Sequence, residues 1–86
     1  MPTVLTLQGW RCYFNSNEGD EPMHVYAQKG AAECKFWLHP DQFVAEEDLE
    51  HNLSPRNRRD VRRIVYQHFD ELAEAWHEHF GGVRAW

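Results

Sequence analysis

The sequence predicts an α+β fold: an antiparallel meander sheet of four to five strands, packed on one face by a single long C-terminal helix. Short runs in which apolar and polar residues alternate fill positions 3–40, as in half-buried strands. Apolar residues then recur every three or four positions between 61 and 80, which is typical of one side of an amphipathic helix. The 86 residues form a single domain, with strands within 3–40, a connector at 41–53, a helix at 54–80 and a tail at 81–86.

The composition is that of a small folded protein. Four Trp, five Phe and three Tyr supply a large apolar area for a short chain, which favours a packed core over disorder. A chain of this size still buries only about 60–65% of its unfolded surface, so its stability is modest unless it oligomerises. The sequence has no signal-peptide pattern and no apolar run long enough to span a bilayer. We therefore expect a cytoplasmic protein without membrane contact.

The charge is unevenly distributed along the chain. The net charge of −5 disfavours broad affinity for nucleic acid, because phosphate binding requires clustered positive charge. Five of the nine basic residues nevertheless lie within positions 56–63, shortly after the acidic run Glu46–Glu50. This segregation indicates either ion pairing between the two segments or a charged docking surface.

The first two predicted strands form a hairpin. Positions 3–7 are β-branched and apolar, Gln8-Gly9 is a turn, and positions 10–15 alternate. The alternation separates two faces, with Trp10, Cys12 and Phe14 on one and Arg11 and Tyr13 on the other. Because nothing in the sequence indicates secretion, we expect Cys12, and Cys34 on a later strand, to be reduced and buried thiols.

A second hairpin is predicted after the polar loop at 16–22. Its turn falls at Gly30, since glycine readily adopts positive φ, and period-two alternation again separates two faces. The inward face carries small and apolar residues such as Val25 and Phe36. The opposite face collects an imidazole, a phenol, a cation and an indole, which belong to His24, Tyr26, Lys35 and Trp37. Tyr13 and Arg11 of the first hairpin are expected beside them.

Several long motifs resemble a known family. MPTVL at the start, YFNSNEGDEP at 13–22, His24-Val25 and KFWL-x-P at 35–40 resemble the small bacterial family of domain of unknown function 4160. The resemblance implies a stand-alone cytosolic protein, often encoded beside another small protein in what looks like a toxin–antitoxin pair, with no agreed activity. The chain departs from the family at Tyr26, which stands where members commonly have a second histidine. It also departs after Pro40, where members usually have an apolar strand and a short Asn/Gly turn.

The connector at 41–53 allows two interpretations. Phe43, Val44, Leu49 and Leu53 could line one side of a short helix, or Phe43-Val44-Ala45 could form a brief fifth strand. The family resemblance favours the strand.

The C-terminal helix has clear start and stop signals. Ser54 is a good N-cap, Pro55 suits the first helical position, and Gly81-Gly82 ends the pattern. Seven apolar residues form its stripe: Val61, Ile64, Val65, Phe69, Leu72, Trp76 and Phe80. At 1.5 Å per residue, a helix from 55 to 80 is about 39 Å long, enough to cross a four-stranded sheet.

Two sets of polar residues are candidate sites. The set around His24 and Trp37 could bind a ligand or RNA, but a solvated sheet face decorated with aromatic and cation–π pairs is the preferred interpretation. The second set, Arg56, Arg59 and Arg63, projects from the outer side of the helix near its N-terminus, where the dipole disfavours positive charge. Pairing with Glu46–Glu50 and docking of an acidic partner or RNA are weighed equally for the whole cluster from Arg56 to Arg63.

No metal site or cofactor is expected. The cysteines and histidines match no zinc spacing, and His77 and His79 point in different directions on the helix. His68 and His79 fall near the apolar stripe, so we expect both at the edge of the core. No phosphate-binding loop and no nucleophile motif is present in the sequence.

The leading functional hypothesis, based mainly on the resemblance, is a non-enzymatic component of a toxin–antitoxin-like module that binds a protein encoded nearby. Its expected binding residues are Tyr13, His24, Tyr26, Lys35, Trp37, Arg59 and Arg63. The alternative is an RNA-binding protein or small metal-independent ribonuclease, with His24 as acid or base, Tyr26 as second proton donor and Lys35 or an arginine as phosphate clamp. A third possibility is a homodimer in which exposed aromatic residues meet across a two-fold axis.

Overall fold

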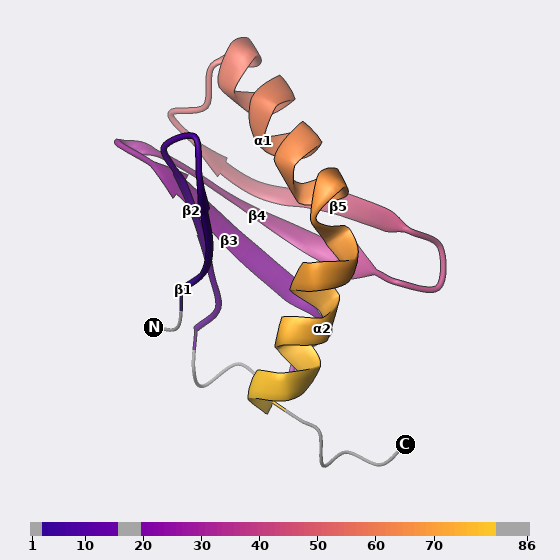
Figure 1. The fold of residues 1–86 in the computed structure, drawn as a ribbon. Helices are drawn as coiled ribbons and strands as arrows, with labels where there is room; N and C mark the ends of the chain where they lie inside the picture. Colours follow the sequence, from indigo (N-terminus) through magenta and orange to yellow (C-terminus); the bar gives the residue numbers. More distant parts are fainter. Residues whose placement is uncertain (1–2, 16–19, 81–86) are drawn as a thin grey trace.

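A computed structural model describes residues 3–15 and 20–80 of the chain. Five strands are followed by two helices (Figure 1): β1 Thr3–Leu7, β2 Trp10–Tyr13, β3 His24–Lys29, β4 Ala32–His39, β5 Val44–His51, α1 Pro55–Gln67 and α2 Phe69–Phe80. Each strand pairs antiparallel with the next, so the order in the sheet is β1-β2-β3-β4-β5. The predicted α+β meander is confirmed, with five strands.

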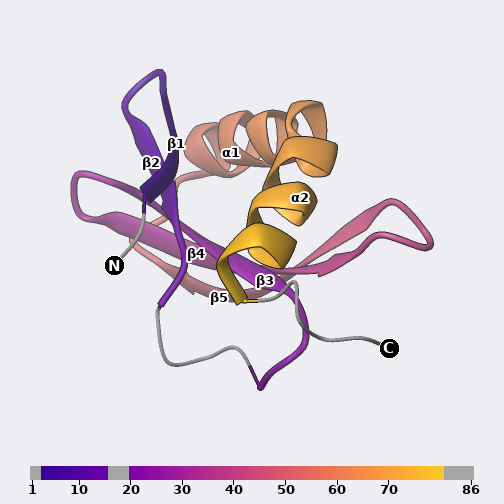
Figure 2. The ribbon, with the colours of Figure 1, turned by 60° about the horizontal axis from the view of Figure 1, so that its bottom comes forward.

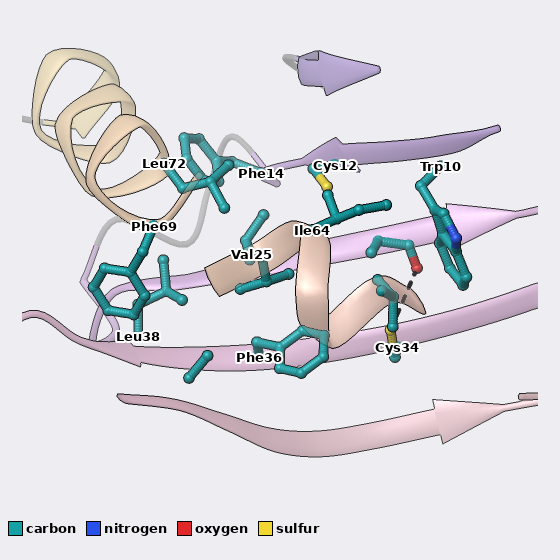
Figure 3. Close-up of a cluster of buried hydrophobic side chains, with 14 of the residues drawn as sticks. Trp10, Cys12, Phe14, Val25, Cys34, Phe36, Leu38, Ile64, Phe69 and Leu72 are labelled. Carbon is teal, nitrogen blue, oxygen red and sulfur yellow. Dashed lines mark hydrogen bonds between the residues drawn. The ribbon is translucent and has the colours of Figure 1, made fainter. Parts of the chain in front are cut away.

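The helices cover one face of the sheet, and the core lies between the two layers (Figures 1 and 2). The strand residues Val25 and Phe36, together with Phe14 directly after β2, meet Ile64 and Leu72 of the helices there (Figure 3). All five of these side chains are buried. At about 25 cal/mol for each Å² of apolar surface, burial of these large side chains dominates the stabilisation of the fold.

The predicted single helix is in fact two helices that meet at His68. This residue has φ −113° and ψ 23°, outside the helical region, and Figure 2 shows the axes of α1 and α2 diverging at this point. Hydrogen bonding continues through the bend, since the His68 N–H donates to Ile64 O (3.1 Å) and the Leu72 N–H donates to His68 O (2.9 Å). The bend lets α2 bury Phe69, Leu72 and Trp76 without leaving the twisted sheet.

Residues 44–51 form an edge strand, so the strand interpretation of the connector is right in kind and the helix interpretation is wrong. The strand is longer than the brief one expected at 43–45, and Phe43 belongs to the turn before it. The tight turn before β5 ends at Phe43, which has φ +54°. Its hydrogen bonds run from the Gln42 N–H to His39 O (3.0 Å) and from the Phe43 N–H to Pro40 O (3.4 Å). Phe43 therefore occupies a left-handed position, which bulky side chains rarely adopt.

A bulge interrupts the pairing of β4 with β5. Cys34 pairs with Glu50 and Phe36 with Glu47, so two residues of β5, Asp48 and Leu49, lie opposite Lys35 alone. The bulge shifts the alternation of β5 by one residue, and Glu47 and Glu50 both come to face the helices as a result.

The two cysteines are buried, free thiols, as predicted (Figure 3). Cys12 pairs with Ala27 and Ala27 with Cys34, so the cysteines are two strands apart, about 9.5 Å between Cα atoms. A disulfide requires less than about 7 Å. Burial raises the pKa of the Cys12 thiol to about 11 and that of Cys34 to about 12.

Neither α1 nor α2 is long and apolar enough to cross a bilayer.

Candidate binding face of the sheet

The predicted site residues of the sheet lie together on the face opposite the helices. The strand register places Tyr13, Tyr26 and Lys35 in one row across three strands. His24 and Trp37 form the next row. Period-two alternation therefore located this cluster correctly, because paired residues of antiparallel strands share a face. We refer to these five residues as the aromatic face.

Stacked rings and cations hold the first row together. The Tyr13 and Tyr26 rings are stacked, with centroids 5.4 Å apart. The Arg11 guanidinium lies 4.4 Å from the centroid of the Tyr13 ring. At the other end, Lys35 Nζ lies 5.5 Å from the Tyr26 ring and 4.0 Å from the Trp37 ring, and 3.9 Å from a Glu21 carboxylate oxygen. Each cation is thus placed over an electron-rich ring face.

Tyr13 and Lys35 are more buried than a solvated sheet face implies, with 5% and 8% of their surface exposed. The Tyr13 hydroxyl donates a hydrogen bond of 2.5 Å to Glu33 Oε2. Burial, followed by this bond to the Glu33 carboxylate, raises the pKa of the phenol well above its usual value, so Tyr13 stays protonated. Both residues form part of a packed platform rather than a free surface.

His24 is completely buried, which corrects the expectation of an imidazole on an open face. Its Nδ1 lies 2.9 Å from Pro22 O. A carbonyl oxygen only accepts hydrogen bonds, so Nδ1 carries the proton and donates it there. The imidazole centroid lies 5.4 Å from Tyr26, 5.1 Å from Trp37 and 5.0 Å from Trp76 of α2. His24 therefore joins the aromatic face to the helix layer, a contact that no local sequence pattern indicates.

Tyr26 and Trp37 are the half-exposed members of the aromatic face. The Trp37 indole N–H donates to Asp48 Oδ2 (2.9 Å), which holds the ring in one orientation. Asp48 was not among the predicted site residues, because its position depends on the bulge in β5. A pocket of about 400 Å³ adjoins Tyr26, lined by Tyr26, Glu33, Cys34, Leu49, Glu50 and His51.

The arginine cluster divides into two groups. Arg58 pairs with Glu50 and lies 3.4 Å from Glu47, and Arg62 lies 3.7 Å from Glu47. The ion-pairing interpretation is therefore right for these two arginines.

The other arginines do not reach the acidic strand. Arg63 lies 3.5 Å from Asp60 of its own helix, whereas Arg56 and Arg59 have no ion-pair partner in residues 3–15 and 20–80. Arg59 and Arg63 are exposed on α1, on the helix side of the sheet, so the structure separates them from the aromatic face.

The remaining histidines are exposed or half-buried. His68 is half-buried, and His79 is exposed with its ring 4.5 Å from Phe80. No group of three or more potential metal ligands occurs within the described residues. His39 lies 3.0 Å from Glu46 on the outer side of β4 and β5.

The fold and this face together define a small α+β domain with a pre-formed aromatic surface on the uncovered side of its sheet. The model of the family described as domain of unknown function (DUF4160) matches residues 9–77. The chain belongs to this family, and the resemblance of the sequence motifs is confirmed. No curated protein and no solved structure matches the chain.

Proposed function

We propose that this protein is a non-enzymatic binding component of a two-gene module of the toxin–antitoxin type, and that the aromatic face contacts its protein partner. The observation that carries the proposal is the pair of half-exposed rings, Tyr26 and Trp37, fixed on a buried platform. Aromatic side chains dominate the energetics of many interfaces. Rings that are already immobilised lose little conformational entropy on binding.

The environment of His24 favours binding over catalysis. A general acid or base must come within hydrogen-bonding reach of its substrate. The His24 ring has no exposed surface, its Nδ1 proton is donated to Pro22, and three aromatic rings surround it. These contacts suit a residue that supports the rings next to it. We expect loss of stability, rather than loss of a chemical step, when the imidazole is removed.

The experiment is co-purification with the product of the adjacent gene, followed by measurement of the dissociation constant. Trp37→Ala should raise this constant by about 30-fold or more, as is typical when an aromatic anchor is truncated. Trp37→Phe, which keeps a ring but loses the N–H bonded to Asp48, should have a smaller effect. The matched control is Glu74→Ala, an exposed position of α2 on the other face.

Two results would contradict the proposal. One is a Trp37→Ala protein that binds the neighbouring gene product as tightly as the unaltered chain, or a neighbour that does not bind at all. The other is cleavage of RNA by the purified protein in excess chelator, with activity lost in a folded His24→Gln variant. The second result would support the ribonuclease alternative.

A further inference from the structure

The open edge of the sheet at β5 combines features that the aromatic face does not explain. Among residues 3–15 and 20–80, the large hydrophobic side chains classed as exposed are Phe43, Val44 and Leu49, at 52%, 36% and 58%. All three lie in β5 or directly before it. Such clustering on one edge marks an interaction surface, because single exposed apolar residues are normally scattered.

The backbone of this edge is closed at one point by Tyr66 of α1. The Ala45 N–H donates to the Tyr66 hydroxyl (2.9 Å), and the hydroxyl in turn donates to Ala45 O (3.4 Å). Tyr66 therefore occupies the groups through which another strand would pair at Ala45. At this end of β5 a partner must therefore bind through side chains rather than by extending the sheet.

Positive charge lies on the helix side of the edge. At 100° per residue, Arg59 projects within about 20° of Tyr66 around the helix axis, and Arg63 within about 60°. Because Tyr66 reaches the β5 edge, both arginines lie exposed on the helix side of this edge, with Arg59 nearer to the direction of Tyr66 and Arg63 turned further from it. Neither pairs with the acidic strand in the described residues: Arg63 lies near Asp60, and Arg59 has no ion-pair partner there.

Negative charge lies on the other side of the same edge. Glu46 pairs in register with Trp37, and Asp48 accepts a hydrogen bond from the Trp37 indole, so both carboxylates belong to the outer face of the sheet. Both are exposed. The edge thus combines exposed apolar side chains with arginines on its helix side and carboxylates on its outer side.

The arginines on the helix side and the carboxylates on the outer side lie at matching positions along β5. Arg58 pairs with Glu50 and Arg62 with Glu47, so α1 runs antiparallel to β5. Their neighbours Arg59 and Arg63 consequently lie at about the level of residues 46–49. A two-fold axis parallel to β5 places the helix side of one copy against the outer side of the other. It leaves the position of every residue along the strand direction unchanged. It brings Arg59 and Arg63 of one copy against Asp48 and Glu46 of the second.

We propose that the β5 edge is a homodimer interface, with the apolar side chains Phe43, Val44 and Leu49 at its centre and reciprocal Arg–carboxylate pairs at its rim. A second copy is the occupant that the charges specify, since it supplies both complementary strips at once. The alternative axis, perpendicular to the sheet, places arginines beside arginines and carboxylates beside carboxylates. The interface borders the aromatic face, since Asp48 holds Trp37 and Leu49 lines the pocket beside Tyr26. The dimer proposal does not depend on which protein binds the aromatic face.

The test is a charge exchange read by sedimentation equilibrium. The unaltered chain should be a dimer. Arg59→Glu with Arg63→Glu, and separately Glu46→Lys with Asp48→Lys, should each raise the dissociation constant by at least about 10-fold, because like charges then meet at the rim. Mixing the two reversed proteins should restore dimers containing one of each, because every strip again faces its opposite.

The control variant Glu74→Lys with Glu78→Lys makes the same charge change on exposed positions of α2 and should dimerise normally. Asp48 also holds Trp37, so the variant that carries Asp48→Lys could fail to fold, which circular dichroism would show. In that case the single reversals Glu46→Lys and Arg63→Glu provide a second pair of complementary variants. The proposal is overturned if the unaltered chain is monomeric at about 1 mM. It is equally overturned if folded reversed variants dimerise normally, or if their mixture stays monomeric.

Discussion

At the scale of the residue, burial has changed the chemistry of several side chains. Cys12 and Cys34 have no exposed surface, and removal from water disfavours a thiolate. Their pKa values rise from 9.0 to about 11 and about 12. The Cys34 thiol also lies 3.9 Å from Ala27 O, a weak contact that suits the neutral form. Both cysteines therefore behave as small apolar core residues.

These two thiols should make the protein less stable as the pH rises above about 9. Between the ordinary pKa of 9.0 and the raised values, the unfolded chain has lost protons that the folded chain retains. The stabilisation is complete below pH 9 and is lost as the pH rises toward 11–12. Each thiol should contribute a slope of roughly −1.4 kcal/mol per pH unit to the free energy of unfolding.

Urea titrations at intervals from pH 8 to about pH 9.5 measure the onset of this slope, in a range where most tyrosine of the unfolded chain is still protonated. In Cys12→Ala with Cys34→Ala the slope should largely disappear, whatever the change in absolute stability. An unchanged slope in that variant would assign the pH dependence to other groups.

At the scale of the element, turns decide how the strands meet. The β3–β4 turn places Gly30 at φ +58°, in the left-handed region, and no atom lies within 4 Å of a Cβ added there. The turn before β5 places Phe43 in the same region at φ +54°. Its ring nevertheless packs 4.7 Å from Phe69, which offsets part of the conformational cost of the turn.

Gly30→Ala should therefore destabilise the protein by about 1–2 kcal/mol, the cost of left-handed φ for a residue with a Cβ. Because the site has room, no steric term is added. Gly30→Asn should cost less, since asparagine visits this region more readily. The order Gly, Asn, Ala in denaturation midpoints is the expected result. Equal midpoints for Gly and Ala would mean that the turn adopts another conformation.

At the scale of the whole molecule, Trp76 connects the two layers. It is 7% exposed. The centroid of its ring lies 5.3 Å from that of Phe14, 5.0 Å from that of His24 and 4.2 Å from that of Phe80. The indole thus touches the core and the inner side of the aromatic face together. Loss of this ring would loosen both the helix packing and the support of the candidate binding face.

Trp76→Ala should lower the free energy of unfolding by about 3–5 kcal/mol, because it removes a large buried ring from a small core. Glu74→Ala on the exposed side of the same helix should change it by less than about 0.5 kcal/mol. Denaturant midpoints of the three proteins decide the matter. A midpoint for Trp76→Ala equal to that of the unaltered chain would show that α2 does not hold the sheet as described.

The sequence by itself determined the first four strands, their order, the β3–β4 turn and the two faces that these strands form, whereas the fifth strand at 44–51 was left open between helix and strand. These features follow from period-two alternation, and a strand with one buried face has little freedom to choose another register. It also determined where the helical region begins and which residues it buries, because Ser54, Pro55 and the apolar stripe are local signals. The grouping of Tyr26, Lys35 and Trp37 followed from the same alternation.

The tertiary structure alone decided the burial of His24, the bend at His68, the bulge at Asp48–Leu49 and the division of the arginines. Each depends on groups distant in the sequence. His24 is covered because Trp76 packs against it from α2. Arg58 and Arg62 pair with the acidic residues of β5, and Arg59 and Arg63 do not, because the angle between α1 and β5 selects one side of the helix for this pairing. Local periodicity carries no information about such contacts, since they form only when the layers pack.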